Sequence, residues 1–333
     1  DPAKARARLR AARRPLILAG GGCRRAGAQV QALAEALGAP VILTTNARGL
    51  MPGHALAVPA SPSLEPVRAL IRGSDQLLVV GSELGPTDCD MYGLGGLPDL
   101  SGMIRIDIDG AQLARHHAAL TLQADAAAIL PALAPPHPAP DGAARADAAR
   151  KAARAALPAG YEAEVRLLEA LRDALPGAIL VGDSTQIAYA GNLYYHHDCA
   201  EGWFNAATGY GALGYATGAA IGAALAAPGR RVVCLTGDGG LMFHPGELRT
   251  ALDEALDIAF VVFNNNGFGE IAAAMRDAGA PVIGCTPSAP DMAALAAAMG
   301  LPFARATDAD LPGLIASGHG PRLIEVQRPE VQA

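Results

Sequence analysis

Residues 231–275 read RVVCLTGDGGLMFHPGELRTALDEALDIAFVVFNNNGFGEIAAAM and contain two apolar segments joined by a helical one. The first apolar segment, residues 232–235, ends at Gly237-Asp238-Gly239-Gly240, and the second, residues 258–263, ends at Asn264-Asn265-Asn266-Gly267. This pattern predicts two parallel strands joined by a crossover helix. Both polar ends are therefore expected at the carboxyl edge of one sheet, where open α/β sheets bind ligands.

The two predicted strand ends carry oxygen donors and glycines. Asp238 offers a carboxylate and Asn265 an amide oxygen, and the 27 positions that separate them leave room for a loop, a helix and a returning strand. Such oxygens suit a hard cation, and glycines let backbone amides approach phosphate oxygens closely. We therefore take this edge as the predicted chemical centre.

Strands and helices alternate along the whole chain. Strands are expected at residues 15–19, 41–45, 76–80, 103–108, 178–181, 232–235, 258–263 and 323–326. Helices are expected at residues 3–14, 26–37, 161–175, 210–227 and 291–299. This order predicts an α/β protein with two doubly wound parallel-sheet domains.

A change in composition separates the two series. Residues 131–160 are rich in Pro, Ala and scattered charges, which is typical of a linker with a short helix. We therefore expect a Rossmann-like domain at residues 1–130 and a second α/β domain at residues 161–333. A chain of 333 residues is long enough to give both domains a core.

The composition excludes several classes of partner. A formal charge of −6 gives no support to a nucleic-acid surface. The five cysteines form no CxxC pair, which favours reduced thiols and a cytoplasmic location. The sequence contains no evident secretory signal or membrane segment.

A second glycine-rich turn, Gly20-Gly21-Gly22, follows the first predicted strand. The dinucleotide motif GxGxxG would require glycine where Arg25 stands. The turn has two interpretations, a phosphate contact at the start of the helix that follows and a plain tight turn. The hypothesis of a nicotinamide-dependent dehydrogenase is supported by this turn alone.

The paired motifs in residues 231–275 resemble the signature of the thiamine diphosphate-dependent enzymes, GDG followed after a similar interval by NN. The resemblance implies that Asp238, Asn265 and the Gly267 carbonyl bind Mg²⁺, and that the amides of Gly239 and Gly240 face the diphosphate. The cofactor-binding residues that it implies in these two loops are Gly237, Asp238, Gly239, Gly240, Asn265, Gly267, Phe268 and Gly269.

The resemblance extends upstream to residues 210–223, YGALGYATGAAIGA, which are similar to the aminopyrimidine-binding segment of acetolactate synthase and 2-oxo acid decarboxylases. It implies that Gly211, Ala212 and Leu213 bind the cofactor. The Gly211 carbonyl would accept a hydrogen bond from its amino group, and Leu213 would wedge it into a V shape. A core leucine at a helix start is the alternative for Leu213. Residues 183–186 resemble the family's loop near the diphosphate and the substrate.

The first domain, with its glycine turn and the IDID sequence at residues 106–109, resembles the central domain of this superfamily. That resemblance leaves FAD as an uncertain cofactor. Members carry a preceding pyrimidine-binding domain whose glutamate activates thiamine diphosphate, so we expect the full-length chain or a partner to supply it. The resemblance also implies a homodimer or homotetramer.

The expected function is thiamine diphosphate- and Mg²⁺-dependent decarboxylation of a 2-oxo acid. The segments GPTDCDMY, GDSTQ and NNNGFGEI are similar to those of decarboxylases acting on 5-guanidino-2-oxopentanoate. Glu270, placed at a helix start, and the acidic residues within 88–92 would suit a guanidinium group. The alternatives are an acetolactate synthase-type carboligase, which predicts FAD, and a noncatalytic cofactor-binding or oligomerisation fragment.

Overall fold

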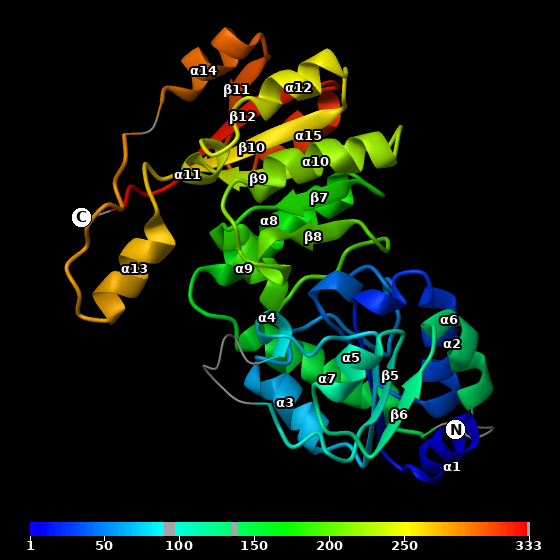
Figure 1. Cartoon of the computed structure of the whole chain (residues 1–333). Helices are drawn as coiled ribbons and strands as arrows, with labels where there is room; N and C mark the ends of the chain where they lie inside the picture. The colour runs from blue at the N-terminus through cyan, green and yellow to red at the C-terminus, as the bar shows by residue number, and fades with distance from the viewer. Residues whose placement is uncertain (90–96, 135–138, 289, 332–333) are drawn as a thin grey trace. The chain divides into compact units, whose positions relative to one another are not determined.

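The computed structural model describes residues 1–89, 97–134, 139–288 and 290–331 (Figure 1). The chain divides into two compact units, Asp1–Glu162 with Ala190–Glu201 and Ala163–Tyr189 with Gly202–Ala333. Each unit contains one six-stranded sheet, and every strand pair in both sheets is parallel. The prediction of two doubly wound α/β domains is thus confirmed.

The sheet of the first unit has the order β3-β2-β1-β4-β5-β6. Its strands are β1 (Pro15–Ala19), β2 (Val41–Leu43), β3 (Ala57–Val58), β4 (Gln76–Val80), β5 (Ile104–Asp107) and β6 (Leu120–Gln123). Its helices are α1 (Pro2–Ala11), α2 (Gly27–Leu37), α3 (Glu65–Arg72), α4 (Pro86–Cys89), α5 (Gly110–Ala114), α6 (Ala126–Ile129) and α7 (Gly142–Ala155), with 3₁₀ turns η1 (Gly21–Cys23), η2 (Thr45–Ala47) and η3 (Leu130–Leu133).

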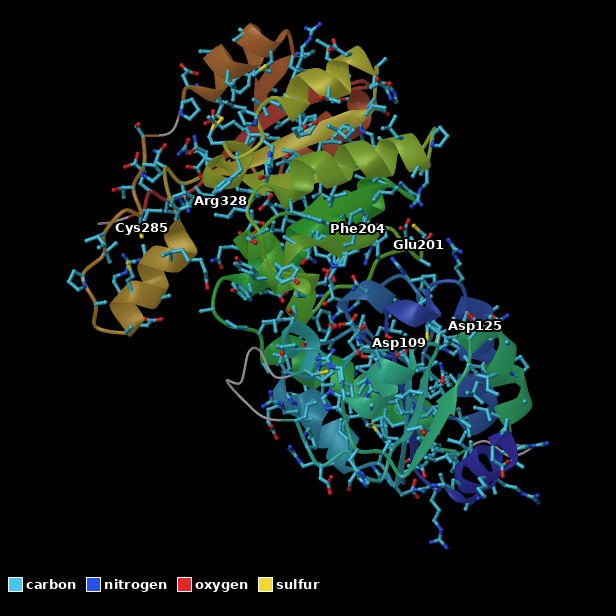
Figure 2. The ribbon with its side chains drawn as sticks, in the orientation of Figure 1. Asp109, Asp125, Glu201, Phe204, Cys285 and Arg328 are labelled. Atoms are coloured by element: carbon cyan, nitrogen blue, oxygen red, sulfur yellow. The ribbon has the colours of Figure 1, made fainter. Side chains whose placement is uncertain are left out.

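Local sequence accounts for where several of these helices begin and end. Gly38 closes α2 in the left-handed conformation, with a φ of 59°, which glycine adopts without strain. Asp109 and Asp125, both labelled in Figure 2, cap α5 and α6 by accepting hydrogen bonds from Ala111 N and Ala128 N at 2.8 and 3.1 Å. Residues 131–160 include the fourteen-residue α7, whose Ala146 and Ala153 are buried, and the first unit extends past them to Glu162.

The Gly20-Gly21-Gly22 turn is packed tightly against the end of β4. A Cβ atom on Gly20 would lie 2.3 Å from the Gly81 carbonyl oxygen, and one on Gly22 would lie 2.8 Å from the Gly81 Cα. The glycines are therefore required by the close approach of two backbones. Beside this turn is a cavity of about 180 Å³, whose lining includes the acidic residues Glu83, Asp107 and Asp125.

The sheet of the second unit has the order β11-β12-β10-β9-β7-β8. Its strands are β7 (Ile179–Gly182), β8 (Trp203–Asn205), β9 (Val232–Gly237), β10 (Ile258–Asn264), β11 (Phe303–Arg305) and β12 (Arg322–Gln327). The helices that belong to this unit wholly or in part are α8 (Tyr161–Ala174), α9 (Gln186–Leu193), α10 (Tyr215–Ala226), α11 (Asp238–Leu241), α12 (Glu247–Asp253), α13 (Gly269–Asp277), α14 (Met292–Met299) and α15 (Leu311–Ser317), with the 3₁₀ turn η4 (Ala206–Thr208).

Buried side chains of α10, α12 and α14 share one apolar cluster with alternate residues of the strands of this sheet. In the sheet, β8 and β9 lie on opposite sides of β7. The connection that leaves β7 and the one that leaves its neighbour β9 therefore run in opposite directions. This is the switch point at which doubly wound sheets bind ligands. Among the described residues, none of the helices is both long and apolar enough to cross a membrane.

Candidate functional site

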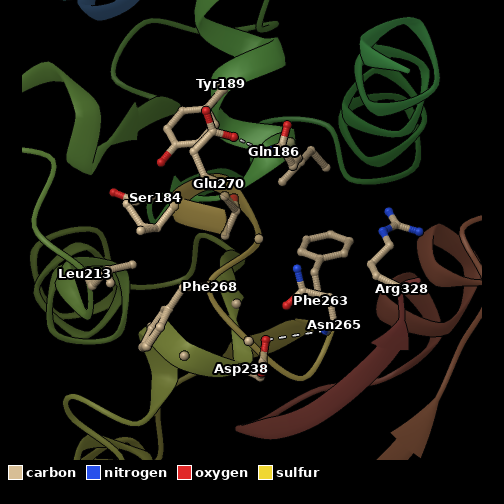
Figure 3. Close-up of a pocket in the computed structure, with 18 of the residues that line it drawn as sticks. Ser184, Gln186, Tyr189, Leu213, Asp238, Phe263, Asn265, Phe268, Glu270 and Arg328 are labelled. Atoms are coloured by element: carbon tan, nitrogen blue, oxygen red, sulfur yellow. Dashed lines mark hydrogen bonds between the residues drawn. The ribbon is translucent and has the colours of Figure 1, made fainter. Parts of the chain in front are cut away.

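A cavity of about 470 Å³ opens at the carboxyl edge of the second sheet (Figure 3). Its walls come from the loops that follow β7, β9, β10 and β12, together with residues of α8, α9 and α13. The motifs predicted to lie together do so here. All the predicted cofactor-binding and metal-binding residues except Ala212, which is exposed, line this cavity.

Asp238 begins the short helix α11 directly after β9 and is only 3% exposed. Burial raises the pKa of its carboxyl group, and hydrogen bonds from backbone N–H groups, including that of Asn265, offset part of this rise. The Asn265 N–H lies 3.4 Å from Asp238 Oδ1. The loop after β10 therefore closes around the carboxylate.

The loop after β10 turns at Asn266 and is tightly packed at Gly267. Asn266 has a φ of 56°, in the left-handed region, and a Cβ atom on Gly267 would lie 2.3 Å from the carbonyl oxygen of Cys285. Asn265 and Gly267 line the same cavity as Asp238. One carboxylate, one amide and one backbone carbonyl are hard oxygen donors, so the residues present fit Mg²⁺.

Two glycines of α11, the short helix that directly follows β9, are needed for packing. A Cβ atom on Gly239 would lie 2.4 Å from the ring of Phe268, and one on Gly240 would lie 2.9 Å from Thr236 Oγ1 and 3.2 Å from the carboxylate of Asp183. Phe268 thus covers one side of the helix while Asp183 lies against the other. Larger side chains would displace the walls of the cavity.

Asp183, at the end of β7, is fully buried and holds the start of α10. Its carboxylate accepts hydrogen bonds from the backbone N–H groups of Ser184, Gly214 and Ala216 at 2.8, 3.2 and 3.0 Å. Burial nevertheless raises the pKa of Asp183. Gly214 is the N-terminal cap residue of α10, and Ala216 lies in its first turn. The Asp183 carboxylate therefore caps this helix although Asp183 is distant from it in the sequence.

The segment before α10 meets the cavity at Gly211 and Leu213. Ser184 Oγ donates a hydrogen bond of 2.9 Å to the Gly211 carbonyl oxygen, which keeps a second lone pair free for another donor. A Cβ atom on Gly214 would lie 2.8 Å from His244 Cδ2. His244 therefore packs against Gly214 and is not among the residues that line the cavity.

The outer wall of the cavity contains an exposed carboxylate. Glu270 lies in the first turn of α13, and its Oε2 accepts a hydrogen bond from the Nε2 of Gln186, the first residue of α9 (Figure 3). Tyr189 and Ile271 line the cavity as well. The sequence singled out Glu270 but gave no role to Tyr189 or Ile271.

Two charged residues that the sequence did not single out, Glu164 and Arg328, form another wall of the cavity. Arg328 Nη1 donates to both carboxylate oxygens of Asp308 at 2.8 and 2.9 Å, and its Nη2 lies 3.4 Å from the Glu164 carboxylate. The guanidinium carbon lies 4.9 Å from the ring centroid of Phe263 (Figure 3). Burial raises the pKa of Glu164, although Arg328 opposes this. Because Arg328 directly follows β12, the strand-end rule could have found it.

Asp88, one of the acidic residues expected to suit a guanidinium group, is not among the residues that line the cavity. Asp88 belongs to the first unit, where its Oδ1 accepts a hydrogen bond of 2.8 Å from the Thr45 N–H. Burial raises the pKa of the Asp88 carboxyl group, although the hydrogen bonds from Thr45 oppose this. Asp90 lies outside the described residues.

Comparisons with known proteins agree with this geometry. The model of the thiamine pyrophosphate enzyme central domain matches residues 3–133, and that of the C-terminal TPP binding domain matches residues 183–326. The "Probable 2-ketoarginine decarboxylase AruI" of Pseudomonas aeruginosa is 38% identical over 316 residues, which are 91% of this chain and 55% of that protein.

Two acetolactate synthases are also similar. Acetolactate synthase isozyme 1 large subunit of Escherichia coli is 30% identical over 80% of this chain and 48% of its own length. Acetolactate synthase large subunit IlvB1 of Mycobacterium tuberculosis is 28% identical over 79% of this chain and 45% of its own length. The chain spans about half the length of these curated relatives. Since the two domain models together cover most of the chain, it belongs to the thiamine pyrophosphate enzyme family.

Proposed function

We propose that the protein takes part in the thiamine diphosphate- and Mg²⁺-dependent decarboxylation of a 2-oxo acid, and that this substrate is 5-guanidino-2-oxopentanoate. The observation that carries the proposal is that one cavity is lined both by the oxygen-bearing residues Asp238, Asn265 and Gly267 and by an exposed carboxylate, Glu270. The relative with 38% identity bears the name of a decarboxylase of the same compound, since 2-ketoarginine is 5-guanidino-2-oxopentanoate.

Mg²⁺ would be held by the Asp238 carboxylate, the Asn265 amide oxygen and the Gly267 carbonyl. Three protein ligands suffice because Mg²⁺ commonly completes its octahedral shell with phosphate oxygens and water. The chemistry that thiamine diphosphate supplies when bound is a nucleophilic ring carbon and an electron sink for the pair released as CO₂ leaves.

Residues before α10 would orient the other half of the cofactor. The Gly211 carbonyl has one lone pair engaged by Ser184 and offers the second to an amino group. Leu213 would press on the cofactor from the same segment. Because the Asp183 carboxylate fixes the N–H groups of Gly214 and Ala216, this segment has a defined position before any ligand binds.

The charges around the cavity favour a substrate with a cationic tail. Arg328 is compensated by Asp308 and Glu164, whereas Glu270 accepts a hydrogen bond from the neutral amide of Gln186. A guanidinium group can form two parallel hydrogen bonds with a carboxylate. Glu270 would therefore bind the guanidinium end while the 2-oxo acid end lies at the cofactor.

The first unit offers a poor site for FAD. The cavity beside its glycine turn is lined in part by Glu83, Asp107 and Asp125, whose charges would oppose a pyrophosphate. Its volume is about 180 Å³, and the turn itself is filled by backbone packing against Gly81. We therefore propose a structural role for this unit without a flavin, which argues against the acetolactate synthase alternative.

The test is CO₂ release from a panel of 2-oxo acids, with the pyrimidine-binding domain present in the same polypeptide. We expect 5-guanidino-2-oxopentanoate to give a higher kcat/KM than pyruvate. A preference for pyruvate with acetolactate as product would assign the carboligase function. Binding of cofactor without turnover of any 2-oxo acid would identify a noncatalytic module.

A further inference from the structure

Glu325 is a buried carboxylate on β12 that does not line the cavity. It is 4% exposed and lies in register with Arg305 on the neighbouring edge strand β11. Its two oxygens have different partners. Oε2 accepts a hydrogen bond of 2.9 Å from Arg305 Nε, and Oε1 accepts one of 2.7 Å from Asn264 Nδ2. The carboxylate therefore links an exposed cation to the last residue of β10.

Glu325 determines how the amide of Asn264 is oriented. A carboxylate only accepts hydrogen bonds, so the NH₂ end of the Asn264 amide must face Glu325. The oxygen end is then directed forward along the chain, where Asn264 Oδ1 accepts a hydrogen bond of 3.1 Å from the Asn266 N–H. This bond closes a side-chain turn around Asn265.

That turn contains Asn265, and the other proposed metal ligand of the β10–α13 loop, Gly267, directly follows it. Asn266 lies between Asn265 and Gly267 and has the left-handed φ of 56°, a conformation that asparagine adopts at some cost and that local hydrogen bonds support. The backbone of Asn264 is held separately, because its carbonyl accepts a hydrogen bond of 2.8 Å from Arg328 N. Within the turn, the Asn265 N–H donates to Asp238 Oδ1 and the Asn265 carbonyl accepts from Val331 N, so the Asn264 side chain is one of several restraints on the conformation of the turn.

We propose that Glu325 is a positioning residue for the metal-binding loop, acting through the amide of Asn264 on the direction of the Asn265 side chain and the Gly267 carbonyl. The part that concerns Mg²⁺ rests on the proposed function, whereas the part that concerns the loop does not. Partners that orient metal ligands typically change metal affinity about 10- to 100-fold when they are replaced.

The hydrogen-bond pattern permits a donor–acceptor exchange as the test. Glu325→Gln alone offers an NH₂ group either to Arg305 or to the NH₂ of Asn264, so one donor is always opposed by another. Asn264→Asp alone sets two carboxylates against each other. In the double variant the new glutamine donates to the new carboxylate and still accepts from Arg305, while the Asn266 N–H keeps its acceptor.

Metal affinity is measured as the binding of Mn²⁺, in place of Mg²⁺, with saturating thiamine diphosphate, by the electron paramagnetic resonance signal of free Mn²⁺. We expect each single variant to bind Mn²⁺ about 10-fold more weakly or worse, and the double variant to return to the value of the starting protein. The matched control is Asp257→Asn, which breaks an ion pair with Arg231 just before β10 begins. It should leave the affinity unchanged.

A second readout needs no cofactor. The amide hydrogen of Asn266 should exchange with solvent faster in Glu325→Gln than in the starting protein, and at the original rate in the double variant. Equal Mn²⁺ affinity and equal Asn266 exchange in Glu325→Gln would overturn the positioning role. If the starting protein bound neither Mn²⁺ nor thiamine diphosphate, the proposed function would fail, while the exchange rates would still decide the role of Glu325 in the loop.

Discussion

Ser184 and Gly211 join two loops of the cavity wall, because the Ser184 hydroxyl donates a hydrogen bond of 2.9 Å to the Gly211 carbonyl. The neighbouring Asp183 carboxylate binds the N–H groups of Gly214 and Ala216 in the same segment. Two adjacent residues at the end of β7 thus fix both ends of residues 211–216. The cavity wall that includes Leu213 is consequently ordered by a strand end 27 or more residues earlier in the chain.

Replacing Asp183 with asparagine should destabilise the protein. The amide NH₂ group that replaces one carboxylate oxygen would face backbone N–H groups that have lost their acceptor. Hydrogen bonds to a charged group contribute about 1.5–3 kcal/mol, so we expect Asp183→Asn to lower the free energy of unfolding by about that amount in urea.

The matched control for Asp183 is Asp291→Asn. Asp291 caps α14 by accepting from Ala293 N and Ala294 N at 2.8 and 3.2 Å, but at an exposed site. Asparagine caps helices about as well as aspartate, so this variant should unfold at nearly the same urea concentration as the starting protein. Equal losses of unfolding free energy in the two variants would show that the buried Asp183 cap stabilises the protein no more than the exposed Asp291 cap does.

The stability contributed by Glu164 should depend on pH with a definite sign. Burial raises the pKa of its carboxyl group above the unfolded value, so the folded state holds the proton more tightly. The stability of the starting protein relative to Glu164→Gln should therefore fall as pH rises from about 4.3, the ordinary glutamate value, through the raised folded pKa. Urea unfolding of both proteins across this range gives the difference. A difference that grows with pH would mean that the Arg328 ion pair outweighs burial.

The central strands could be predicted from the sequence to within one or two residues. β1 and β4 have the predicted bounds, because strands buried on both faces contain continuous apolar runs such as residues 77–80 of β4. All four edge strands, β3, β6, β8 and β11, were missed. β3 and β8 are only two and three residues long, and β6 and β11 are mostly not buried, so their sequences carry no apolar pattern.

Residues of the candidate site could be predicted from the sequence where they directly follow strands. They could not be predicted where their position depends on contacts between distant parts of the chain. The proposed metal ligands Asp238, Asn265 and Gly267 lie in motifs that end neighbouring strands, so topology alone brings these residues together. Glu164 reaches the cavity from α8, and no sequence pattern marks a helical glutamate as a pocket residue. The pairing of Glu325 with Asn264 likewise needed the register of β10 and β12.

Removing the Asp238 carboxylate should abolish Mg²⁺-dependent binding of thiamine diphosphate. Asp238→Ala leaves the metal without its charged ligand, so calorimetric titration with cofactor and Mg²⁺ should show no saturable heat. Asp253→Ala is the control, since Asp253 is an exposed residue paired with Arg249 in α12. If Asp238→Ala bound the cofactor as tightly as the starting protein, the metal assignment would be wrong.

Substrate preference should depend on Glu270. Loss of a hydrogen-bonded charge pair costs about 1.5–3 kcal/mol, which corresponds to roughly 10- to 100-fold. Glu270→Gln should therefore lower kcat/KM for 5-guanidino-2-oxopentanoate by that factor and leave a 2-oxo acid with an uncharged side chain unaffected. Glu247→Gln is the control, because Glu247 occupies the first turn of α12 and does not line the cavity. An equal loss with both substrates would exclude a role in recognising the tail.

A methyl group at Gly239 should weaken cofactor binding without unfolding the protein. The new Cβ atom would lie 2.4 Å from the Phe268 ring, so Phe268 must move and take the metal-binding loop with it. Gly246→Ala is the control, because nothing lies within 4 Å of a Cβ atom at Gly246 and its φ is −60°. Calorimetry should show weaker binding of thiamine diphosphate with Mg²⁺ in Gly239→Ala and unchanged binding in Gly246→Ala, while both variants retain a cooperative urea transition. Unchanged affinity in Gly239→Ala would mean that Phe268 can shift independently of Asn265 and Gly267.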